Sequence, residues 1–154
     1  MRILYAGFKG KYNSARVLLD KIDVMTDDKL YLTNSFVTSE KELRRKLEHG
    51  VYDLIIGIGQ LKLDKNVIRI EKFGRGEEDF ETSYDYGKLK LDLEKEGFLV
   101  EESIRTNYLC NNIYYYGLRY IHEKKFLTKM IFIHVPKLDE LDFVDRLAGV
   151  LTRL

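Results

Sequence analysis

Asp53-Leu54-Ile55-Ile56-Gly57-Ile58 is the stretch that decides the fold class. Its continuous apolar run, rather than an alternating one, is typical of a strand buried on both faces of a sheet. Further strand patterns occur at residues 2–7, 29–32, 67–70, 98–101 and 129–135, with helical patterns between most of them. This order predicts an α/β protein, a three-layer sandwich in which helices cover both faces of a mostly parallel, twisted sheet.

The helices are predicted from their caps and from periodic apolar residues. Asn13 and Ser14 suit the N-cap of a helix over residues 15–22, and Ser39 with Glu42 suits the capping box of a helix that ends at Gly50. Further helices are expected over residues 84–96, 108–124 and 138–154. The chain of 154 residues fits one domain, residues 1–154, with enough apolar material for a core.

Composition argues against several classes of protein. The 26 basic and 25 acidic residues give a net charge of +1, whereas nucleic-acid binders carry a basic excess or patch. No apolar run approaches the length of a membrane span, and the first strand pattern is too short for a signal peptide. The single cysteine excludes an intrachain disulfide, so we expect a reducing, cytoplasmic location.

Three residues with catalytic chemistry fall at or just beyond predicted strand ends. Glu71 closes the strand over 67–70, His134 lies near the end of the strand over 129–135, and Cys110 falls in the first predicted helical turn after 98–101. In open α/β sheets, functional groups gather at the carboxyl ends of the strands. We therefore expect these three side chains to form one site.

The three residue types form a coherent catalytic set. A helix start stabilises a thiolate and offers backbone N–H groups to an oxyanion. A histidine takes the thiol proton, and a carboxylate on its far ring nitrogen orients the ring. Each residue also has a simple packing explanation: a small core cysteine, a buried histidine with satisfied hydrogen bonds, and a surface glutamate at a strand end. No cluster of residues has the spacing of metal ligands, so no metal or cofactor is expected.

Two sequence motifs resemble those of the pyroglutamyl-peptidase I family, the pyrrolidone-carboxylate peptidases. The segment 106–111, Thr-Asn-Tyr-Leu-Cys-Asn, followed by Tyr114, resembles the family's nucleophile motif. The segment 132–136, Phe-Ile-His-Val-Pro, resembles its catalytic-histidine motif, at a matching separation. Weaker likenesses are the segment 68–71 around the family's catalytic glutamate, Gly59-Gln60, and the pairs Gly7-Phe8 and Asn13-Ser14.

The resemblance implies a cysteine peptidase that removes an N-terminal pyroglutamyl or related small acyl group from peptides. Its partner would be a peptide with a blocked N-terminus, and the family commonly forms homo-oligomers. By the same resemblance Cys110 is the nucleophile, His134 the general base and Glu71 the group that orients it. Four further residues are implied in substrate binding, Phe8, Asn13 and Gln60 in the acyl pocket and Arg75 near the oxyanion.

The sequence also departs from the family pattern. The family has a longer segment between the glutamate and the cysteine, Lys9 and Gly10 replace a Pro-Phe pair, and Ile104-Arg105 replace Ala-Gly. These changes leave open a second hypothesis, a diverged member that binds a ligand or partner without turnover. A third hypothesis assigns the tyrosines of residues 108–120 to a subunit interface, against ordinary core and rim packing.

Overall fold

The computed structural model describes residues 1–103 and 108–154. The motif residues Ile104, Arg105, Thr106 and Asn107 lie outside the described residues. A six-stranded sheet has the order β2-β1-β3-β8-β4-β7. Its strands are β1 (Ile3–Phe8), β2 (Lys29–Leu32), β3 (Leu54–Gln60), β4 (Val67–Glu71), β7 (Leu99–Ser103) and β8 (Lys129–Val135).

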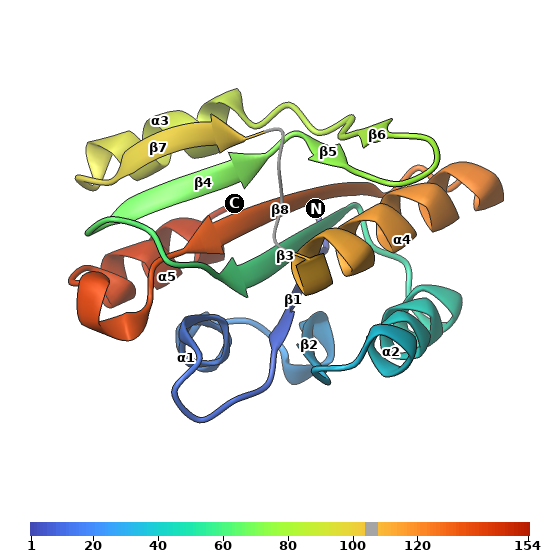
Figure 1. Ribbon diagram of the computed structural model, residues 1–154, viewed down its shortest axis with the longest axis horizontal. Coiled ribbons are helices and arrows are strands. Elements are labelled where there is room, and N and C mark those ends of the chain that lie inside the picture. Colours follow the sequence, from blue (N-terminus) through green and yellow to red (C-terminus); the bar gives the residue numbers. More distant parts are fainter. Residues whose placement is uncertain (104–107) are drawn as a thin grey trace.

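Helices cover both faces of this sheet (Figure 1). One buried cluster joins the sheet to α1, α3 and α5, and a second joins the other face to α2 and α4. The expected three-layer α/β fold is confirmed. The helices are α1 (Ser14–Lys21), α2 (Phe36–His49), α3 (Gly87–Lys95), α4 (Tyr108–Lys124) and α5 (Val144–Thr152).

The direction of β4 matters most for the site. Strands β2, β1, β3 and β8 run parallel, whereas β4 pairs with β8 antiparallel and with β7 parallel. After β4 the chain forms a small hairpin of β5 (Phe73–Gly74) and β6 (Phe80–Glu81), which the sequence did not predict. Two-residue strands are too short to give a periodic pattern. The hairpin packs beside α4 (Figure 1).

Two predicted helix boundaries were wrong. Helix α2 begins at Phe36, and its N-cap is Ser35, whose side chain accepts a hydrogen bond from the Thr38 N–H. Ser39 lies buried inside the helix. Its predicted capping partner Glu42 instead accepts hydrogen bonds from the Thr33 N–H at 2.8 Å and the Thr33 hydroxyl at 2.6 Å. A contact with the preceding strand end therefore takes the carboxylate that a capping box would need.

The last predicted helix, residues 138–154, is divided. A 3₁₀ turn at Leu138–Glu140 precedes α5, which begins only at Val144. Asn66 accounts for the break: its N–H donates to the Glu140 carbonyl at 2.9 Å, and its side chain accepts from the Asp142 N–H at 2.9 Å. These long-range bonds occupy backbone groups that a continuous helix would use. No helix in the described part of the chain is long and apolar enough to cross a membrane.

Candidate active site

Glu71 and His134 meet across the antiparallel pair β4–β8. The register places Glu71 opposite Phe132 and Arg69 opposite His134, so Glu71 and His134 are diagonal neighbours on the face covered by α4. The His134 Nδ1 lies 2.7 Å from the Glu71 Oε1. Both side chains have no solvent exposure. The two groups therefore form a fixed, dry hydrogen-bonded pair.

This geometry arises differently from the sequence expectation. The expected rule places functional groups together where parallel strands end. Glu71 does end β4, but β4 runs against β8, so its end lies beside Phe132 in the interior of β8. Cross-strand pairing, rather than a shared sheet edge, brings the carboxylate to the imidazole.

The pair leaves two polar atoms without partners. Among the described residues, Glu71 Oε2 and His134 Nε2 are buried and have no hydrogen-bond partner. An ionised carboxylate only accepts hydrogen bonds, so the proton of the neutral ring belongs on Nδ1 and the lone pair on Nε2. Buried groups of this kind are rare because each costs about 1–3 kcal/mol. The structure therefore leaves at Nε2 a buried lone pair that is able to accept a proton.

Cys110 lies near the imidazole ring, in the same buried cluster as Phe132. It is the third residue of α4 and is 6% exposed. A Cβ built on Gly59 would lie 2.6 Å from the Cys110 Sγ and 3.1 Å from the His134 Cδ2, the ring atom bonded to Nε2. The thiol sulfur and the Cδ2 atom of the ring therefore both lie next to the position that a Cβ of residue 59 would occupy. Any side chain at position 59 would occupy this space, so the arrangement requires glycine at this position near the end of β3.

The electrostatics keep the resting thiol protonated. Burial, and secondarily the negative charge of Glu71, raises the pKa of Cys110 to about 12. A free-standing thiolate is thus disfavoured at neutral pH. The same carboxylate stabilises an imidazolium that hydrogen-bonds to it. The arrangement therefore favours transfer of the thiol proton to His134 during attack over a thiolate formed beforehand.

Tyr114 joins α4 to the end of β4. Its hydroxyl donates to the Glu71 backbone carbonyl at 2.9 Å, and its ring is fully buried against Phe132. The sequence analysis used Tyr114 only as part of a motif and as one of several tyrosines. Its spacing of four residues from Cys110 was the available signal, because such residues share a helix face.

The other predicted binding residues divide between the two faces of the sheet. Phe8, at the end of β1, lies in the same buried cluster as Cys110 and Phe132. Asn13 caps α1 by accepting from the Ala15 N–H at 2.9 Å, on the opposite face. Gln60 also turns to that face, where its side-chain oxygen accepts from the Ser14 N–H at 3.0 Å. The structure thus places Phe8 with the three candidate catalytic residues and uses Asn13 and Gln60 to fix α1.

Arg75 lies on the hairpin, next to α4. Its guanidinium group pairs with Asp79 and lies 4.6 Å from the centre of the Phe73 ring. Its backbone is hydrogen-bonded to Asn111, the residue that follows Cys110. The backbone of Arg75 is therefore placed near the candidate nucleophile, while the charge of its side chain is directed to Asp79.

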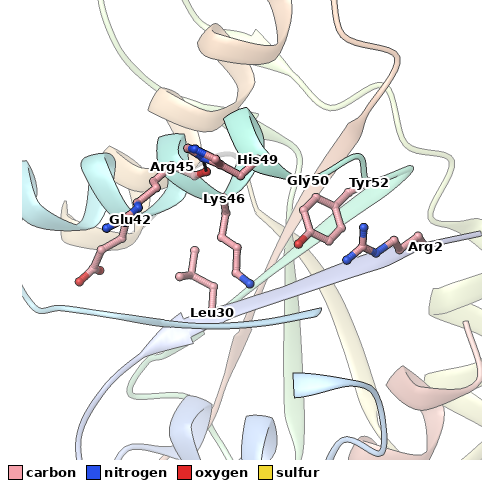
Figure 2. A pocket seen from close by; sticks show the side chains of 8 residues that line it. All are labelled: Arg2, Leu30, Glu42, Arg45, Lys46, His49, Gly50 and Tyr52. Carbon is pink, nitrogen blue, oxygen red and sulfur yellow. Dashed lines mark hydrogen bonds between the residues drawn. The ribbon is translucent and has the colours of Figure 1, made fainter. Parts of the chain in front are cut away.

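A cavity of about 540 Å³ lies elsewhere, between the carboxyl end of α2 and the amino end of β1 (Figure 2). Figure 2 shows Lys46 extending from α2 toward Leu30 of β2, with the Tyr52 ring beside them. None of the seven predicted site residues lines it; the lining consists of Arg2, Leu30, Glu42, Arg45, Lys46, His49, Gly50 and Tyr52. No three metal-ligating side chains cluster anywhere in the described ranges. This cavity is therefore separate from the cluster formed by Cys110, His134 and Glu71.

The fold and the site define a three-layer α/β protein with a buried Cys–His–Glu group on one face of its sheet. More narrowly, the chain has the fold of pyrrolidone carboxyl peptidases. A mutant of that enzyme from Pyrococcus furiosus matches with a TM-score of 0.83 and 18% identity, over 98% of this chain and 94% of that one. The enzyme of Fervidobacterium islandicum AW-1 gives 0.80 and 18%, over 98% and 92%. Pyroglutamyl peptidase I of Bacillus amyloliquefaciens gives 0.83 and 17%, over 97% and 92%.

No protein-family model matches the sequence, and no curated protein matches it significantly. The likeness to solved structures extends over nearly the whole of both chains, but at 17–18% identity it establishes the fold alone. Fold does not determine function, which has to be argued from the site.

Proposed function

We propose that this protein is a cysteine hydrolase that removes a small uncharged acyl group, pyroglutamyl foremost, from the N-terminus of peptides. One observation carries the proposal. His134 is wholly buried, its Nδ1 is held by Glu71 at 2.7 Å, its Nε2 has no partner among the described residues, and its Cδ2 and the Cys110 Sγ both lie beside Gly59. This is the relation that a nucleophile, a base and an orienting group require.

The chemistry follows from these positions. Cys110 Sγ attacks the acyl carbonyl carbon while its proton passes to His134 Nε2, and the imidazolium then protonates the leaving amine as the C–N bond breaks. Backbone N–H groups of the first turn of α4, which lack partners within the helix, support the oxyanion. Water attacks the resulting thioester, giving its proton to Nε2, and the free acid leaves as the thiol is restored.

The surroundings of the thiol favour an uncharged acyl group. The buried cluster around Cys110 includes Phe8, Tyr114 and Phe132. A free α-amino group would carry a positive charge into this apolar region, and burial of a charge is costly. A pyroglutamyl group has no such charge, because its nitrogen is an amide within the ring. This supports a peptide with a blocked N-terminus as the substrate.

The second candidate function is a binding protein that retains the fold without turnover. The raised pKa of the thiol and its 6% exposure are the observations that favour it. Under this alternative Cys110 is a small core residue and the Glu71–His134 pair is structural. It predicts a thiol that reacts slowly with alkylating reagents, because thiolate is the reactive species.

The deciding experiment measures release of a fluorescent amine from a pyroglutamyl-amide substrate by the native protein, Cys110→Ala and His134→Ala. Iodoacetamide labelling of Cys110 across pH runs in parallel, and circular dichroism checks each fold. We expect turnover that both substitutions abolish. Labelling without turnover would retain the hydrolase and reject the pyroglutamyl group. The catalytic proposal would be rejected if the native protein shows no turnover and iodoacetamide labels Cys110 equally slowly in the native protein and in His134→Ala.

A further inference from the structure

Asn111, the residue after Cys110, makes an unusual pair of bonds to the β5–β6 hairpin. The Arg75 N–H donates to its Oδ1 at 2.8 Å, and its Nδ2 donates to the Arg75 carbonyl at 2.8 Å. One side-chain amide thus satisfies both backbone groups of a single residue, as a neighbouring β-strand would. The first turn of α4 is thereby fixed to the hairpin.

The β5–β6 hairpin packs closely against α4. A Cβ on Gly74 would lie 2.7 Å from the Tyr115 Cα, and one on Gly76 would lie 2.3 Å from the Tyr115 ring, so only glycine permits this approach to α4. At its base the Thr82 N–H donates to the Lys72 carbonyl at 2.9 Å. Since Lys72 directly follows Glu71, the hairpin is a short arm that reaches from the carboxylate to the helical turn that carries the thiol.

We propose that Asn111 is a positioning residue that holds the Cys110 thiol in register with the Glu71–His134 pair. The inference rests on the proposed hydrolase function. The first turn of a helix lacks intrahelical partners for its N–H groups and frays readily. A displacement of about 1 Å in an active site lowers the rate about 100-fold. The amide of Asn111 prevents such a displacement by tying this turn to the segment that extends from Glu71.

Asn112 offers a matched control within the same turn. Its Nδ2 donates to the Glu40 Oε1 on α2 at 3.1 Å, away from the hairpin. Asn111 and Asn112 are both half-buried and both anchor α4 through a side-chain amide. Loss of either one weakens the attachment of α4, but only Asn111 joins the thiol to the arm from Glu71.

The test compares the native protein with Asn111→Ala, Asn112→Ala and Gly74→Ala. The last variant separates the hairpin from Tyr115 without substituting a residue of α4, and it provides a second test if Asn111→Ala folds poorly. Measurements are kcat and KM on the pyroglutamyl-amide substrate, the iodoacetamide rate of Cys110 from pH 6 to 10, and Tm. We expect Asn111→Ala and Gly74→Ala to lower kcat about 10- to 100-fold with little change in KM. Their alkylation profiles should move to that of His134→Ala, and Asn112→Ala should keep the native kcat, KM and alkylation profile.

Two other results have distinct meanings. If Asn111→Ala lowers Tm but matches Asn112→Ala in kcat and in its alkylation profile, Asn111 is only structural and the inference is overturned. If the native protein shows no turnover, and its alkylation profile equals that of His134→Ala, the hydrolase proposal fails. This inference then fails with it. The first pattern contains an active native enzyme and the second does not, so the two failures are distinguishable.

Discussion

Replacing Glu71 by glutamine tests the central pair of the site with almost no change of shape. Glutamine keeps an oxygen that can accept from His134 Nδ1 but removes the charge that supports an imidazolium at 2.7 Å. Removing one partner of a fully buried ion pair costs about 3–5 kcal/mol. At about 1.4 kcal/mol per factor of ten, kcat should fall roughly 10²- to 10⁴-fold if His134 is charged in the transition state.

The same substitution should not weaken the fold. The Glu71 side chain has zero exposure, and its Oε2 has no partner among the described residues. Burial of a charge without a counter-charge is costly, so the neutral amide should leave Tm unchanged or raise it. A catalytic loss accompanied by equal or higher stability is the pattern expected of a functional, rather than structural, carboxylate.

The assay is kcat on the pyroglutamyl-amide substrate, with differential scanning calorimetry for Tm and a spectroscopic thiol titration for Cys110. The negative charge of Glu71 raises the pKa of Cys110, so removing that charge should lower the pKa. Reactivity of the thiol toward iodoacetamide above pH 8 should therefore increase while turnover decreases. A Glu71→Gln enzyme that keeps kcat within about threefold of native would refute the assigned role of Glu71.

Three further predictions follow from the site. Gly59→Ala should abolish turnover and block alkylation of Cys110, because its Cβ would lie 2.6 Å from Sγ. Gly57→Ala is the control, because the three atoms nearest to its Cβ all belong to Phe132, and it should lower Tm but leave the thiol reactive. Equal alkylation of both variants would contradict this prediction. Tyr114→Phe should lower the unfolding free energy by about 1–3 kcal/mol in urea titration, because the Glu71 carbonyl loses its buried donor; an unchanged midpoint would show that water replaces the hydroxyl. The thiol pKa is raised to about 12, so folding favours the protonated form: this stabilisation is present below about pH 8.5, the pKa of a free thiol, and is lost as pH rises toward 12. Native protein should thus lose more stability than Cys110→Ala between pH 9 and 12 in thermal melts, and parallel curves would be inconsistent with a buried thiol.

Much of the fold could be predicted from local sequence. The strands over 29–32 and 129–135 and the helix over 108–124 match their observed bounds, because apolar runs and helical periodicity there end at clear breaks. The errors at Ser39 and in residues 138–154 come from long-range contacts, Glu42 with Thr33 and Asn66 with Glu140 and Asp142. Such contacts override local propensity, and no local pattern contains them.

The sequence proposed the residue types of the candidate site but not the strand pairing that brings Glu71 to His134. A parallel connection requires about a dozen residues or more, and only residues 61–66 separate β3 from β4, so the reversal of β4 was within reach of the sequence. The positions of Gln60 and Asn13 on the α1 face were less accessible. Side chains alternate along a strand, and the face assigned to each depends on which neighbour strand is paired and in what register.

The closed base of the hairpin has a consequence for how such proteins diverge. Residues 72 and 82 are joined by a backbone hydrogen bond, so the intervening residues form a loop whose ends already meet. Lengthening a loop of this kind costs only about 0.6 kcal/mol per doubling. Insertions and deletions between residues 72 and 82 can therefore change this segment while the strands that carry Glu71 and His134 keep their register. The length of the hairpin can therefore vary while its base stays closed, provided that the contacts of Arg75 with Asn111 and of Gly74 with Tyr115 are kept.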